Sequence, residues 1–173
     1  LLSSLDNLKY LVINESESYD YSALSTLVNL EHLIIGRTKG RINDLSFTEN
    51  MSNLTTLSNL TSTGIWDYSF LESLPNLEYL LLRGGANIYD SSPLSYLTNL
   101  KYLDLAHTPV TKLEGLANLT NLEYLYLHRS NISNIDSVKN LVSLKEISLF
   151  LTDVRDLTAL GYCKNLEVIN LAT

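Results

Sequence analysis

The chain has one cysteine, few basic residues and no long apolar run. Because Cys163 is alone, an intramolecular disulfide and catalysis by a cysteine pair are excluded. The 12 Lys and Arg against 19 Asp and Glu give a formal net charge of -7. This balance argues against nucleic acid or an acidic membrane surface as the binding partner, since both bind proteins mainly through Lys and Arg. No apolar run reaches the roughly 18 residues of a membrane-spanning helix, so no membrane insertion is expected.

Motifs that carry enzymatic chemistry are also missing. There is no HExxH, no GxSxG and no glycine loop able to hold a phosphate. Of the histidines, only His107 and His128 fall on adjacent turns, and with Asp104 they offer too few ligands on an open sheet to predict a metal site. We therefore expect no catalytic residue, no metal and no cofactor.

One phrase recurs eight times, at intervals of 22 to 24 residues. It consists of Leu, two variable residues, Leu or Ile, one variable residue and, in seven copies, a further aliphatic residue. The copies begin at Leu8, Leu30, Leu54, Leu77, Leu100, Leu122, Leu144 and Leu166. The phrase and its period are the signature of a leucine-rich repeat, in which stacked turns form a solenoid.

The turn from 122 to 142 shows how each repeat folds. Its apolar residues alternate with Tyr124, Tyr126 and His128, as in a strand with one buried side. Apolar residues then recur every three positions, which suits 3-10 turns, at Ile132, Ile135, Val138 and Leu141. The same spacing in the next turn gives Val154, Leu157, Leu160 and Cys163. The sequence thus predicts an α/β solenoid, a right-handed leucine-rich-repeat horseshoe with a parallel concave β-sheet and a mostly 3-10 or irregular convex side.

Two features interrupt the pattern. Asn59 occupies an inward position, so we expect it to bond to backbone at a bulge or to give its place to Leu60. The turns that begin at Leu30, Leu54 and Leu77 have one or two extra residues and should be irregular. The first of them contains Arg37, Lys39 and Arg41, which form either a solvated loop or a site for an acidic partner.

Asn76, Asn99, Asn121 and Asn165 stand directly before the first Leu of their repeats. With these residues the chain resembles bacterial internalin-like leucine-rich repeat proteins over essentially its whole length. The resemblance implies a secreted or cell-surface bacterial protein whose curved sheet binds a host, neighbouring-cell or self partner. It also implies an asparagine three residues after the last strand leucine. This sequence departs from that pattern with Ser16, Thr38, Ser62, Gly85, Thr108, Ser130 and Thr152, so a sparser ladder of hydrogen bonds is expected there.

Outward strand residues of successive turns stack in columns, which predicts a binding face. Tyrosine and arginine dominate protein interfaces because they bury a large rigid surface and keep a polar group. We expect a protein partner, or a glycan, to bind Tyr79, Leu81, Arg83, Tyr102, Asp104, Tyr124, Tyr126, His128 and Phe150 on the concave face. The alternative is that these aromatic residues only stabilise the sheet through cross-strand packing.

Residues 1–173 are expected to form a single leucine-rich repeat domain of about eight repeats. Terminal turns of solenoids usually have polar caps, and this sequence shows none, which suggests a fragment of a longer chain or self-association through an uncapped end. The expected function is non-enzymatic protein binding by a secreted or surface protein. Two other functions remain open: a cytoplasmic regulatory scaffold for a partner enzyme, and a structural spacer.

Overall fold

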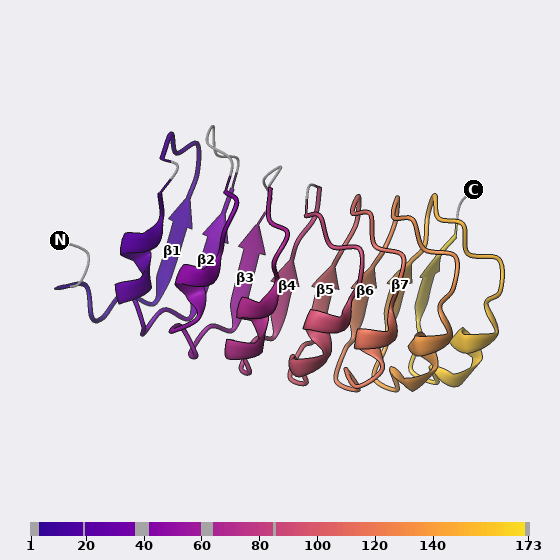
Figure 1. Ribbon diagram of the computed structural model, residues 1–173. Coiled ribbons are helices and arrows are strands. Elements are labelled where there is room, and N and C mark those ends of the chain that lie inside the picture. Colours follow the sequence, from indigo (N-terminus) through magenta and orange to yellow (C-terminus); the bar gives the residue numbers. More distant parts are fainter. Residues whose placement is uncertain (1–3, 19, 37–41, 60–63, 85, 172–173) are drawn as a thin grey trace.

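The computed structural model describes residues 4–18, 20–36, 42–59, 64–84 and 86–171. Eight parallel strands lie side by side in chain order in one open sheet, and short 3-10 helices connect them on the opposite side (Figure 1). The strands are β1 Tyr10–Ile13, β2 His32–Ile35, β3 Thr56–Asn59, β4 Tyr79–Leu81, β5 Tyr102–Asp104, β6 Tyr124–Tyr126, β7 Glu146–Ser148 and β8 Val168–Asn170. The helices are η2 Ser22–Thr26, η3 Ser46–Thr48, η4 Ser69–Ser73, η5 Ser92–Tyr96, η6 Glu114–Leu116, η7 Asp136–Asn140 and η8 Thr158–Tyr162. The predicted leucine-rich repeat solenoid is confirmed.

The register places equivalent residues of neighbouring repeats directly opposite each other. Leu80 of β4 pairs with Leu103 of β5, which pairs with Leu125 of β6. The outward residues Tyr79, Tyr102 and Tyr124 pair in the same order. Because side chains alternate along a strand, this register keeps every leucine column inside and every tyrosine column outside.

The core is a single cluster of mainly aliphatic residues along the solenoid axis, with Phe47, Tyr68 and Phe70 among them. In the turn that starts at Leu100, each of the seven inward aliphatic positions is at most 3% exposed: Leu100, Leu103, Leu105, Val110, Leu113, Leu116 and Leu119. The three-residue spacing therefore does place the connecting segment against the axis. In the last turn Leu160 and Cys163 are buried as expected, but Leu157 is 37% exposed. Within the described residues no further turn packs over it.

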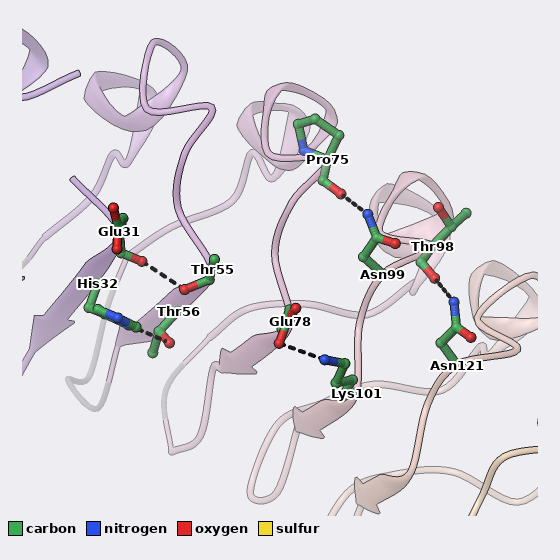
Figure 2. A network of polar contacts seen from close by, with 10 residues as sticks. All are labelled: Glu31, His32, Thr55, Thr56, Pro75, Glu78, Thr98, Asn99, Lys101 and Asn121. Carbon is green, nitrogen blue, oxygen red and sulfur yellow. Dashed lines mark hydrogen bonds and ion pairs between the residues drawn. The ribbon is translucent and has the colours of Figure 1, made fainter. Parts of the chain in front are cut away.

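A ladder of asparagine side chains joins the turns where the chain enters each strand. The amide nitrogen of Asn121 donates to the carbonyl of Thr98 at 2.9 Å, and that of Asn99 donates to the carbonyl of Pro75 at 3.0 Å (Figure 2). Equivalent bonds are made by Asn29, Asn53, Asn76 and Asn165. Ser143 occupies this position in the seventh repeat, and there Asn140 reaches the carbonyl of Ala117 instead. The asparagines before the first Leu thus satisfy carbonyl groups between successive turns.

Hydroxyl residues stand where a second asparagine ladder would be, and the described ones form hydrogen bonds within their own turns. Thr108, Ser130 and Thr152 each donate to the carbonyl three residues earlier, at 2.6, 2.6 and 2.7 Å. A hydroxyl on a short side chain satisfies only this local acceptor. At this side of the solenoid, backbone groups make the bonds between turns, as when the N–H of His107 donates to the carbonyl of His128 at 3.0 Å.

A second repeated motif starts most of the 3-10 helices. An Asp side chain accepts the backbone N–H two residues later, as Asp67 does from Ser69 and Asp156 from Thr158. These hydrogen bonds lower the pKa of both carboxyl groups below its usual value. Asp and Asn favour such local turns because their short side chains reach the backbone two residues on.

Charges alternate in the column that directly follows the first Leu of each phrase. Lys9 pairs with Glu31 at 2.9 Å, Glu78 with Lys101 at 2.8 Å, and Glu123 with Lys145 at 2.7 Å (Figure 2 shows the second pair). Thr55 interrupts the alternation between Glu31 and Glu78. These pairs are partly exposed, so each contributes little to stability, but together they favour one register.

Among the described residues, the turns after β1, β4, β5, β6 and β7 each contain one residue with left-handed backbone dihedrals. Glu15, His107, Arg129 and Leu151 have φ between 52° and 59°, and Gly84 has φ of 81°. Glycine adopts this conformation without strain, so Gly84 suits the turn that follows β4. The other four residues adopt it at a cost.

Several sequence predictions fall outside the described residues. These are the basic cluster of Arg37, Lys39 and Arg41, the side chain of Asn59, and Leu60. Three positions of the predicted sparser ladder, Thr38, Ser62 and Gly85, also lie outside the described residues. The backbone of Asn59 continues the ladder of β3 opposite Ile35.

Truncation of a central inward leucine should strongly destabilise the array. We expect Leu103→Ala to lower the free energy of unfolding by about 2 to 5 kcal/mol, because a fully buried Leu leaves a cavity. Urea denaturation measures the loss. The exposed Val142→Ala is the control and should change stability by less than about 0.5 kcal/mol. Equal effects of the two substitutions would contradict the register.

Relief of the left-handed strain should stabilise the chain. Glu15 is an exposed residue at φ 52°, so Glu15→Gly removes strain while it loses little buried area. A left-handed L-residue costs roughly 1 to 2 kcal/mol and glycine loses roughly 0.5 to 1 in entropy, so a net gain of about 0.5 to 1 kcal/mol is expected. A lower melting temperature than that of the parent chain would contradict the turn geometry.

Candidate functional site

Four tyrosines form a contiguous cluster on the outward side of β4, β5 and β6, which we call the tyrosine patch: Tyr79, Tyr102, Tyr124 and Tyr126. The ring of Tyr102 lies 6.2 Å from that of Tyr79, 6.1 Å from that of Tyr124 and 5.3 Å from that of Tyr126, centroid to centroid. All three pairs are tilted, in the range where aromatic rings attract each other. Tyr102 is thus the centre of the patch.

The patch is only partly buried by its own packing. Tyr79 is 42% exposed, and the other three rings are half-buried. Burial, together with the nearby carboxylates of Asp104 and Glu146, raises the pKa of the Tyr102 hydroxyl. The pKa of Tyr126 is also raised, by burial first and then by the adjacent Glu146. Both hydroxyls are therefore neutral at physiological pH and able to donate a hydrogen bond.

Two hollows border the patch on the same face. A shallow, largely apolar hollow of about 340 Å³ is lined by Thr56, Tyr79, Leu81 and Tyr102. A larger hollow of about 510 Å³ lies toward β8, and we call it the histidine hollow. It is lined by Arg83, His107, Tyr126, His128, Arg129, Glu146, Ser148, Phe150 and Asn170.

The histidine hollow is rich in cationic and potentially cationic groups. The rings of His107 and His128 meet edge to face with centroids 5.5 Å apart. Burial lowers the pKa of both histidines, and the positive charges of Arg83 and Arg129 lower it further, while Asp104 acts in the opposite direction. Both rings are accordingly neutral at pH 7.

Most of the residues predicted to bind a partner come together here. The four patch tyrosines and Leu81 line or border the apolar hollow, while Arg83, His128 and Phe150 line the histidine hollow. Asp104 differs from the rest. It is 5% exposed, and its carboxylate accepts the N–H of Ala106 at 2.9 Å, so it lies beneath the surface and has little area to offer a partner.

The set of partner-binding residues predicted from the sequence did not include His107, Arg129 and Glu146, which line the histidine hollow. His107 and Arg129 directly follow the last outward strand position, and the left-handed turn returns them toward the sheet face. Glu146 lies opposite Tyr124 on the neighbouring strand β7. A further aromatic pair lies outside the sheet: the exposed rings of Trp66 and Tyr89 stack at 6.5 Å.

Within the ranges that the structure describes, no three His, Cys, Asp or Glu residues are grouped so that they could hold a metal ion. Asp104, His107 and His128 are thus not such a group. In the same ranges no helix is both long and apolar enough to cross a membrane.

Comparison with known proteins places this chain among the leucine-rich repeats. The family model for two-copy leucine-rich repeats matches residues 98–141. A search of curated protein sequences gave no match. The ectodomain of the plant membrane receptor kinase GASSHO1/SCHENGEN3 from Arabidopsis thaliana, solved with CASPARIAN STRIP INTEGRITY FACTOR 2, superposes over 98% of this chain and 22% of its own, with a TM-score of 0.80 and 24% identity. That likeness concerns the fold alone.

Two internalin structures from Listeria monocytogenes are more similar. An internalin (inlF) is 33% identical with a TM-score of 0.92, and the match covers 99% of this chain and 50% of the internalin. Internalin C2 is 31% identical with a TM-score of 0.89, over 99% of this chain and 74% of its own. The chain belongs to the internalin-like leucine-rich repeat family. It spans about half the length of the first of these relatives. The fold is in general that of a protein-interaction module, and such modules are typically not enzymes.

The charge environment of the hollow can be tested by titration. We expect Arg129→Gln to raise the pKa of His107, because the positive charge that opposes its protonation is removed. The rise should be partial, since burial is the larger cause. Histidine ring signals in NMR spectra measure it. Lys139→Gln in η7 does not line the hollow and serves as the control. If the pKa of His107 were the same in Arg129→Gln as in the parent chain, the placement of Arg129 beside His107 would be contradicted.

Proposed function

We propose that this chain is a non-enzymatic module that binds a protein partner on the concave, outward side of its sheet, with the tyrosine patch as the main contact. The observation that supports this most is the continuous run of partly exposed rings centred on Tyr102, which sits next to an apolar hollow. Buried aromatic anchors surrounded by polar groups are typical of the residues that dominate interface energies.

The alternative function for the tyrosines is stabilisation of the sheet alone. Their tilted contacts do contribute, by roughly 0.5 to 1.5 kcal/mol for each pair. This function does not require the exposed area that Tyr79 retains or the apolar hollow beside it. Both features fit a surface that becomes buried when a partner binds, so we favour the binding function over a structural spacer.

We further propose that the protein acts outside a bacterial cell, as a secreted or surface protein. The support is membership of the internalin-like family and similarity to two Listeria internalins. A cytoplasmic regulatory scaffold is the other candidate. Cell fractionation of the native organism distinguishes the exported protein from the cytoplasmic scaffold. Recovery of the protein only in the cytoplasmic fraction would contradict export.

Replacement of the tyrosines should abolish partner binding without loss of the fold. The variant is Tyr102→Ser, Tyr124→Ser and Tyr126→Ser together, measured by pull-down and then by calorimetry with the partner recovered. Loss of three central aromatic anchors should weaken binding at least about 100-fold, since single hot-spot residues contribute about 2 kcal/mol or more.

The chain offers a matched control with the same chemical change. Tyr89, Tyr96 and Tyr162 are exposed outside the sheet, and their replacement by Ser should leave binding unchanged. Circular dichroism confirms that both variants fold. Equal affinity of the patch variant and the parent chain would refute the proposed face.

A further inference from the structure

We propose that the histidine hollow receives a carboxylate side chain of the protein partner, an Asp or Glu that lies beside the apolar residues contacting the tyrosine patch. This inference rests on the proposed function and specifies the chemistry of the partner. The patch and the hollow are continuous, since Tyr126 contacts Tyr102 and also lines the hollow.

The guanidinium groups of the hollow have no acidic partner among the described residues. Lys9, Lys101 and Lys145 each pair with a glutamate of a neighbouring turn. Arg83 and Arg129 are exposed, line one hollow and form no such pair within the described part of the chain. Arginine binds carboxylates through two parallel hydrogen bonds, so both side chains are available to an external carboxylate.

The acidic groups near the hollow are already engaged. The Asp104 carboxylate is buried and accepts the N–H of Ala106. Glu146 lies beside the Tyr126 hydroxyl and raises its pKa. The charged side chains that line the surface of the hollow are two arginines and one glutamate, and the Asp104 carboxylate lies beneath them. The two exposed guanidinium groups are therefore the positions that can attract an anionic group.

Two observations favour a single carboxylate on a protein over a polyanion. The net charge of -7 repels nucleic acid and anionic membranes, whose binding needs several cations in a row. Phe150 and Tyr126 line the same hollow, and Tyr102 adjoins it, so the ligand must also present apolar surface. A protein segment with one acidic and several apolar side chains satisfies both conditions.

Binding of a carboxylate should be coupled to protonation of the histidines. The groups that face His107 and His128 are Arg83, Arg129, Asp104 and Glu146. Burial, and then the two arginines, keep the pKa of both rings low in the free chain. A bound carboxylate raises that pKa, so binding takes up protons, and affinity increases as pH falls from 7.5 to 5.5.

The test uses a phage-displayed library of random peptides selected on the parent chain. The strongest binder is synthesised and titrated by calorimetry against the parent, the patch variant, Arg83→Gln with Arg129→Gln, and Arg155→Gln as a matched exposed control. We expect selected peptides to share an Asp or Glu beside aromatic or aliphatic residues. The double arginine variant should bind at least about tenfold more weakly, as loss of a charge-assisted hydrogen bond implies, and the control should bind equally well.

Two further measurements identify the interacting groups. Replacement of the peptide carboxylate by its amide should weaken binding to the parent but not to the double arginine variant. Affinity should rise several-fold between pH 7.5 and 5.5, and this rise should be lost in His107→Gln with His128→Gln.

The outcomes separate this inference from the proposed function. Peptides that need the tyrosine patch but lack a shared carboxylate, or bind the double arginine variant equally well, would overturn the inference and leave the proposed face intact. Failure to select any peptide that depends on the patch would count against both.

Discussion

The structure depends on one constraint: each turn must return to the same register after 22 to 24 residues, so that an inward leucine always lies beside an inward leucine. A shift of one residue would exchange the leucine columns with the tyrosine columns. The asparagine ladder and the alternating charges operate between adjacent turns and favour this register. The side-chain amides satisfy carbonyl groups that the sheet does not reach. The ion pairs form only when neighbouring strands are in register, so they are lost if a strand slips.

The binding face is a consequence of the same constraint. Because the core uses only the inward half of each strand, the outward half is free to vary, and its residues accumulate into columns. Small or buried outward side chains, such as those of Asp104 and Ser148, lie low beside the larger rings of Tyr102 and Tyr126. The left-handed turns after β5 and β6 then add His107 and Arg129 to the edge of the face. The result is the tyrosine patch, which continues into the histidine hollow. This combination suits a partner with apolar and acidic side chains.

The sequence was sufficient to predict the fold, since the leucine spacing determines both the strand and the three-residue spacing of the connecting turn. Cys163 is buried in place of a leucine, as its position indicated. Prediction of the site was less complete, for physical reasons. The turn geometry that brings His107 and Arg129 onto the face depends on backbone dihedrals that ordinary residues rarely adopt, so no pattern in the sequence indicated it. The low exposure of Asp104 depends on its hydrogen bond to the backbone and on the size of its neighbours, neither of which is visible in a column of letters. The exposure of Leu157 depends on the lack of a covering turn among the described residues.

The central claim, that alternate residues of each strand face the core and the binding surface, is tested most directly by cysteine accessibility along β6 and the residues after it. Single cysteines are placed at positions 124 to 128 of a chain in which Cys163 is replaced by Ala, and their rates of thiol labelling are compared under native conditions. Fast labelling at Tyr124, Tyr126 and His128 with slow labelling at Leu125 and Leu127 is the result expected from their exposure. Labelling rates without this two-residue period would contradict the account.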